Sequence, residues 1–183
     1  MQVPSNFKPL YSRDEIERAV KKIASEITLW AEEVWEKSQT DILAIPILRG
    51  GLFFYADIVR CVQHSVGMAP ARSWGYELNK NNVKRDTVEM NLDDVPARGR
   101  NVLLVDDICD SGRTLKALTR GLLEIGALEV KTAVIVRRAI PEPEHIPDWT
   151  GFEYEGTEWL VGYGMDDSDR WRNLPDIYVI KQG

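Results

Sequence analysis

The chain has 183 residues, of which 44% are hydrophobic and 28% are charged, and its formal net charge at pH 7 is −6. This length and balance predict one globular domain with a sizeable core. The acidic excess argues against nucleic acid as a partner, which would need an excess of Lys and Arg. No apolar run approaches the ~20 residues that span a bilayer, and the first residues lack a secretory-signal pattern. Cys61 and Cys109 fit a reduced compartment, so we expect a cytoplasmic protein without a membrane partner.

Helix and strand patterns alternate along the first two thirds of the chain. Residues 12–15 match a capping box, and apolar residues at spacings of three and four then predict a helix to residue 34. Further strands are expected at 41–47, 69–74, 88–92, 101–105 and 129–136, and further helices at 52–64 and 114–125. The alternation over residues 41–136 indicates α/β architecture with a doubly wound parallel sheet.

Two segments break this alternation. Residues 75–85 turn polar and predict an exposed, mobile loop. Residues 137–183, here called the hood, contain clustered prolines, short apolar runs and several aromatic residues, which predict a small β-rich subdomain over one end of the sheet. We therefore expect a single domain over residues 1–183, with a core at about 10–136 and the hood at its C-terminal end.

The most informative segment is 102–114. A run of four apolar residues predicts a buried strand, and Asp106 and Asp107 follow at its C-terminal end, where ligands bind in open parallel sheets. The loop at 110–114 then enters a helix, so its backbone N–H groups suit a phosphate, and Gly112 lacks the Cβ that would hold an anion away. Paired carboxylates beside a phosphate cradle predict a sugar phosphate and Mg²⁺ as ligands.

This segment resembles the phosphoribosyl pyrophosphate (PRPP) signature of the type I phosphoribosyltransferases. Residues 46–57 resemble the pyrophosphate loop of the hypoxanthine-guanine phosphoribosyltransferases, and 159–166 and 170–175 resemble their purine-binding and C-terminal motifs. The motifs follow the family's order over residues 10–180. The resemblance implies the type I phosphoribosyltransferase fold and Mg²⁺-dependent transfer of 5-phosphoribosyl from PRPP to hypoxanthine or guanine. The products would be a nucleoside 5′-monophosphate and pyrophosphate, as in purine salvage.

The resemblance also implies roles for residues of the signature. Asp106 and Asp107 would hold the ribose hydroxyls, directly or through Mg²⁺, although the family more often has Glu at the first position. Asp110 would be the general base that takes the proton from purine N7. The 5′-phosphate would be held by Ser111, Gly112, Arg113 and Thr114. For Asp110, capping of the following helix is an alternative that is compatible with the catalytic role.

Pyrophosphate would be held at the other motifs. Arg49 stands where the family most often has Lys, Gly50 follows it, and Arg172 matches an Arg that contacts pyrophosphate. Asp166 matches a carboxylate that reaches Mg²⁺, with a simple ion pair to Arg172 as the alternative. The family's non-proline cis peptide bond would fall between Leu48 and Arg49.

The base would lie against the hood. Trp159 matches the aromatic residue that stacks on the purine, for which core packing is the alternative, and Leu160 matches the residue whose backbone contacts the ring edge. Arg137 stands where purine-specific members have the Lys that binds O6, and its larger fork prefers two acceptors. The family's loop Ser-Tyr pair has Ser73-Trp74 or Tyr76 as its nearest candidates. These departures leave the preferred base open.

Two other interpretations stay open at the level of sequence. The chain is alternatively a PRPP- or nucleotide-sensing regulator on the same fold, or a transferase for another base such as xanthine. Because the family forms dimers or tetramers, the resemblance also implies a homodimer or homotetramer.

Overall fold

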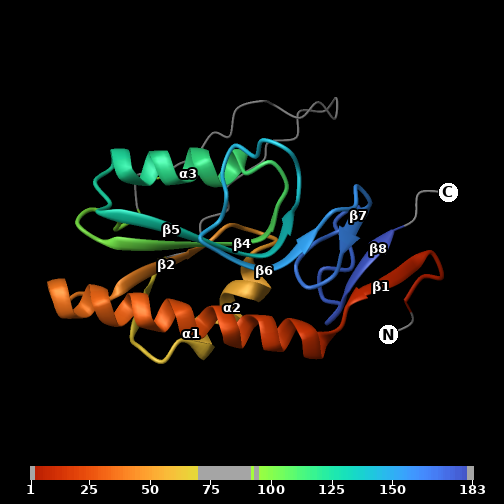
Figure 1. Ribbon diagram of the computed structural model, residues 1–183, viewed down its shortest axis with the longest axis horizontal. Coiled ribbons are helices and arrows are strands. Elements are labelled where there is room, and N and C mark those ends of the chain that lie inside the picture. Colours follow the sequence, from red (N-terminus) through yellow and green to blue (C-terminus); the bar gives the residue numbers. More distant parts are fainter. Residues whose placement is uncertain (1–2, 70–91, 93–94, 181–183) are drawn as a thin grey trace.

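A parallel sheet with strand order β3-β2-β4-β5-β6 lies at the centre of the computed structural model, which describes residues 3–69, 92 and 95–180 (Figure 1). In chain order its strands are β2 (Ile42–Pro46), β3 (Val66–Met68), β4 (Asn101–Cys109), β5 (Glu129–Arg138) and β6 (Trp149–Tyr154). Every neighbouring pair within this sheet is parallel. The C-terminal ends of β2, β4 and β5 therefore meet at one edge, where ligands of such sheets bind.

Helices cover both faces of this sheet. Helices α1 (Arg13–Ser38) and α2 (Leu52–Cys61) lie on one face and α3 (Arg113–Glu124) lies on the other (Figure 1). Because side chains alternate along a strand, β4 supplies both cores: Leu103 packs toward α1 and α2, whereas Leu104 packs toward α3. The expected doubly wound α/β architecture is confirmed.

Helix α1 begins as its sequence predicts. The Ser12 side chain accepts a hydrogen bond from the Glu15 backbone, and the Glu15 carboxylate accepts one from the Ser12 backbone, which completes the capping box. The apolar stripe is buried against the sheet as far as Val34, and the helix ends before Gln39, whose φ of 54° is left-handed.

The hood contributes to two sheets. Its β6 joins the edge of the parallel sheet beside β5, with Trp149 opposite Ala133. Its β7 (Trp159–Val161) and β8 (Ile177–Ile180) form an antiparallel sheet with β1 (Phe7–Tyr11), in the order β1-β8-β7. The sequence did not predict β1, because this short segment is ordered by strand partners about 170 residues away rather than by a local pattern.

Several element boundaries differ from the expected ones. Helix α2 ends at Cys61 rather than at residue 64, since Val62 is extended, and the strand expected at 69–74 is preceded by β3 at Val66–Met68. Apart from Ala69 and Leu92, the strands expected at 69–74 and 88–92 lie outside the described residues, as do the loop at 75–85 and its Ser73-Trp74 and Tyr76 candidates. Among the residues described, no helix is both long and apolar enough to span a bilayer.

Candidate active site

Two adjoining cavities open at the C-terminal ends of β2, β4 and β5. The larger, of about 460 Å³, is lined by residues 47–50 and 106–115 together with Asp166 and Arg172. The smaller, of about 170 Å³, is lined by Asp107, Ile108, Asp110, Arg138, Trp159, Leu160, Met165 and Asp166. Four of these residues line both cavities, so a ligand in one would border a ligand in the other. All predicted site residues except Arg137 line one or both cavities.

The two adjacent carboxylates are the most buried charged groups of the site. Asp106 is 9% exposed and Asp107 is 8% exposed. Burial, and then the neighbouring Asp107 charge, raise the pKa of Asp106 well above its ordinary range, and burial also raises the pKa of Asp107. Backbone donors offset part of this cost, because Asp107 N–H binds Asp106 Oδ1 and Ile108 N–H binds Asp107 Oδ1, each at 2.9 Å. A cation or a pair of hydroxyl donors placed here would stabilise the charged pair.

The loop before α3 is shaped by the segment that crosses behind it. Gly112 has a φ of 82°, and a Cβ at this position would collide with the backbone of His145. The Glu144 N–H donates to the Ser111 carbonyl at 2.8 Å. Backbone conformation and His145 therefore both require glycine here, independently of any bound anion. The N-cap of α3 is Gly112, which has no side chain, and the Arg113 N–H donates to Ser111 Oγ at 3.4 Å, whereas Asp110 Oδ1 accepts from Arg138 instead of taking the alternative capping role.

A second backbone loop closes against the carboxylates. The Leu48–Arg49 peptide bond is cis, as the resemblance implied. A Cβ at Gly50 would collide with the Asp107 carboxylate, and a Cβ at Gly164 would collide with the Gly50 carbonyl oxygen. The hood turn therefore rests directly on the loop at 49–50, which in turn rests on Asp107.

Besides Arg113 in the loop before α3, two arginines line the larger cavity, and both are paired with carboxylates of the hood. Arg49 binds Asp169 at 2.6 Å, and Arg172 binds Asp166 at 2.6 Å. The alternative ion pair between Asp166 and Arg172 is thus present in the structure. Asp166 Oδ2 also accepts from the Asp169 backbone at 2.7 Å, which ties both pairs into one network.

The smaller cavity has an aromatic wall. Trp159 is 51% exposed and its indole N–H donates to the Asp166 carbonyl at 2.6 Å, so the alternative of core packing does not hold. Leu160 is buried beside it. Ile108 and Met165 also line this cavity but were missed by the sequence analysis. Ile108 could have been found from the length of β4, which continues to Cys109 rather than ending near residue 105.

The structure places Arg138, not Arg137, in the smaller cavity. Arg137 lines neither of the two cavities and pairs with Glu153 at 2.6 Å. Adjacent residues of a strand point to opposite faces, so a register difference of one residue exchanges the two arginines. Arg138 is thus a third residue of this cavity that the sequence analysis missed, and only the register of β5 separates it from its neighbour.

The carboxylates of the site fit Mg²⁺ only if the substrate supplies some of the metal's ligands. Within the described ranges, no group of three or more His, Cys, Asp or Glu side chains is placed to hold a metal ion. Mg²⁺ is commonly bound by one or two carboxylates together with waters and substrate phosphates. Asp106, Asp107 and Asp166 meet that requirement because all three line the larger cavity.

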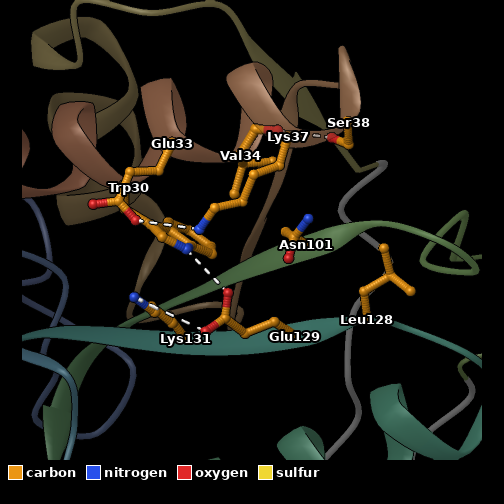
Figure 2. Close-up of a pocket in the computed structure, with 9 residues that line it drawn as sticks. All are labelled: Trp30, Glu33, Val34, Lys37, Ser38, Asn101, Leu128, Glu129 and Lys131. Atoms are coloured by element: carbon orange, nitrogen blue, oxygen red, sulfur yellow. Dashed lines mark hydrogen bonds and ion pairs between the residues drawn. The ribbon is translucent and has the colours of Figure 1, made fainter.

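Another cavity, of about 250 Å³, lies at the opposite end of the strands and holds none of the predicted residues (Figure 2). Trp30 donates to Glu129 at 3.1 Å, and Lys131 lies 5.0 Å from the Trp30 ring and 5.5 Å from the Trp149 ring. These contacts join α1 to β5 and β6, which indicates a structural role.

Comparisons with known proteins agree with this geometry. The model of the phosphoribosyl transferase domain family matches residues 11–168. A hypoxanthine-guanine phosphoribosyltransferase of Aquifex aeolicus is 31% identical over 178 residues, which cover 96% of this chain and 95% of that protein. Its counterpart in Bacillus subtilis is 33% identical and covers 95% and 93%. A solved hypoxanthine-guanine phosphoribosyltransferase of Bacillus anthracis has a TM-score of 0.70 at 26% identity, covering 99% and 100%.

The contact between Gly164 and Gly50 predicts a costly substitution. Gly164→Ala places a side chain against the Gly50 carbonyl at a φ of 105°, whereas Gly99→Ala also places a side chain at a positive φ, of 70°, but with open space around its Cβ. We expect Gly99→Ala to lower the free energy of unfolding by about 1–2 kcal/mol and Gly164→Ala by about 1–3 kcal/mol more. Urea unfolding measures both, and equal losses would contradict the close packing.

Because His145, which packs against Gly112, is partly buried, the free energy of unfolding should depend on pH. Burial lowers the pKa of His145, whose ring lies 3.0 Å from Thr132 Oγ1 with Asp148 beside it. The unfolded chain then binds the proton of His145 more tightly than the folded chain. The stability that comes from keeping His145 neutral is therefore fully present above pH ~6.5 and is lost as pH falls toward the folded pKa, by at most about 1.4 kcal/mol per pH unit. His145→Gln removes this loss.

Urea unfolding from pH 7.5 to 5 checks this, with His64→Gln as the control for removing an imidazole. The free energy of wild type should fall more steeply than that of His145→Gln. Parallel curves for these two proteins would show that His145 does not titrate differently on folding.

Proposed function

The chain belongs to the phosphoribosyl transferase domain family, and we propose that it is a Mg²⁺-dependent hypoxanthine-guanine phosphoribosyltransferase of purine salvage. The observation that carries the proposal is the pair of adjoining cavities. One contains paired carboxylates and a helix N-terminus, which suit a sugar phosphate, and the other has an aromatic wall, which suits a flat base.

The larger cavity would hold PRPP. The 5′-phosphate would lie on Ser111, Gly112, Arg113 and Thr114, at the positive end of α3. Asp106 and Asp107 would accept hydrogen bonds from the ribose hydroxyls, which replaces the water that burial has removed from them. Mg²⁺, held by Asp106 and Asp107 or by Asp166 together with substrate oxygens and waters, would supply positive charge beside the leaving pyrophosphate.

Pyrophosphate would lie between Arg49, the Gly50 backbone and Arg172. To bind pyrophosphate, Arg49 must break its ion pair with Asp169. Both side chains of this pair are exposed, so the pair is weak. As pyrophosphate departs from C1′, negative charge grows on it, and the two guanidinium groups stabilise that charge in the transition state.

The smaller cavity would hold the purine between Trp159 and Ile108, with Leu160 at the ring edge. Asp110 lines both cavities, so its carboxylate can take the N7 proton as the bond to C1′ forms. Holding the purine nitrogen in line with C1′ supplies much of the acceleration. Arg137 was predicted to select a 6-oxopurine, but the guanidinium that borders this cavity is that of Arg138.

We also propose a cytoplasmic homodimer or homotetramer. The support is the family's assembly and, for the compartment, the two free thiols and the acidic charge. The location of Cys109 in the core, where burial raises the pKa of its thiol to about 11, fits a thiol that stays reduced.

The experiment that tests the proposed function is nucleotide formation from PRPP and Mg²⁺ with a panel of free bases. We expect inosine or guanosine monophosphate from hypoxanthine and guanine, and no product from adenine, uracil or orotate. Product from xanthine alone would replace the proposed base. No product from any base, with PRPP still bound, would contradict the enzyme and favour a sensing role.

A second test concerns Asp110. Asp110→Asn keeps the shape of the side chain but removes the proton acceptor, so we expect turnover to fall about 10²–10⁴-fold with little change in PRPP affinity. Asp14→Asn, on the exposed first turn of α1, is the control and should turn over at the wild-type rate. Turnover near that of wild type in Asp110→Asn would remove Asp110 from the role of general base.

A further inference from the structure

Arg138 connects the proposed general base to the segment that leads into β7. It is the last residue of β5, and the pairing of Cys109 with Arg137 places it beside Asp110, just past the end of β4. Its Nε lies 2.6 Å from Asp110 Oδ1. The Arg138 side chain is 15% exposed, whereas that of Asp110 is 62% exposed, so a largely buried cation holds a carboxylate that reaches into solvent.

The other nitrogens of the same guanidinium bind the segment 155–158, which joins β6 to β7. One NH₂ group donates to the Gly156 carbonyl at 2.5 Å and the other to the Glu158 carbonyl at 3.3 Å. The guanidinium also lies 5.5 Å from the ring of Tyr154, whose hydroxyl donates to the Glu158 carboxylate at 2.7 Å. Every edge of the guanidinium thus has a partner, which fixes its plane.

We propose that Arg138 is a positioning residue that sets the distance and orientation between Asp110 and Trp159 across the smaller cavity. Glu158, which its guanidinium binds, directly precedes Trp159. One rigid fork therefore holds Oδ1 of the base and the backbone that carries the aromatic wall, and it leaves Oδ2 of Asp110 for the purine. The inference rests on the proposed function, since it assigns Asp110 the proton and Trp159 the purine.

Arginine is required for this role. Its planar fork satisfies one carboxylate and two carbonyls at once, whereas the ammonium of a lysine is a point charge that reaches only one side. Arg138→Lys therefore separates the two connections, because it keeps the cation beside Asp110 and loses the carbonyls at 156 and 158. Arg138→Met removes both connections with a similar apolar stem.

The chain supplies a control arginine just before the core of β4. Arg100 is partly buried, and its Nε and one NH₂ group donate to the Asp41 carbonyl at 3.3 and 2.9 Å, at the end of the sheet opposite the site. Arg100 lines neither cavity of the site, so Arg100→Met removes a partly buried arginine that binds a carbonyl without touching Asp110 or the segment 155–158.

The test is steady-state kinetics of wild type, Arg138→Lys, Arg138→Met and Arg100→Met with PRPP and the purine that wild type uses, together with their Tm values. We expect Arg138→Met to lower kcat about 10- to 100-fold and to raise KM for the purine at least fivefold, with KM for PRPP unchanged. Arg138→Lys should keep the raised purine KM but recover most of kcat. Arg100→Met should stay within about twofold of wild type in all three constants.

Each other outcome has a distinct meaning. A wild-type protein that forms no nucleotide overturns the proposed function, and the inference falls with it. If wild type is active but Arg138→Met behaves like Arg100→Met, the inference alone is overturned. A loss in which Tm falls and both KM values rise together, without recovery in Arg138→Lys, would assign Arg138 a structural role and would also overturn it.

Discussion

The site depends on the burial of two adjacent carboxylates at the end of β4. Asp106 and Asp107 are both less than 10% exposed, and burial raises the pKa of both. Removing charge from water is costly unless partners replace the lost hydration, and one backbone hydrogen bond to each side chain replaces only part of it. The folded chain therefore holds an acidic pair that a ligand with hydroxyls or positive charge would stabilise.

Close backbone contacts hold this pair in place. The loop at 49–50 approaches Asp107 so closely that only glycine fits at 50, the hood turn approaches that loop so closely that only glycine fits at 164, and His145 excludes a side chain at 112. Three segments far apart in sequence thus stack around the carboxylates without intervening side chains. Such packing leaves little room to adjust, which suits a site whose reacting groups must be held in line.

Local patterns predicted the core of this arrangement. The apolar run, the acidic pair and the glycine loop are contiguous over residues 102–114, so strand, loop and helix follow from neighbours in the sequence. The capping box of α1 is equally local. In contrast, β1 is ordered by β8, and β6 is placed by its register with β5, so neither has a local signal that assigns it to its sheet. Ile108 and Arg138 depend on strand length and register, which sequence patterns locate only to within a residue or two.

The difference between Arg137 and Arg138 shows how a shift of one residue in strand register changes the assignment of function. Both are arginines, both are largely buried and both pair with a carboxylate, so residue type alone does not separate them. The pleat of β5 separates the two arginines, because it directs Arg138 to the cavity and Arg137 to Glu153 on β6. The same pleat sets Arg138 at the junction of β4, β5 and the segment that enters β7, where one side chain touches both Asp110 and the segment 155–158. A site assembled from two sheets needs such a junction, because the antiparallel sheet shares no strand pairing with the parallel one in the described residues. The relative placement of Asp110 and Trp159 therefore depends on contacts between the sheets, and the guanidinium of Arg138 makes one that reaches both Asp110 and the backbone of Glu158, next to Trp159.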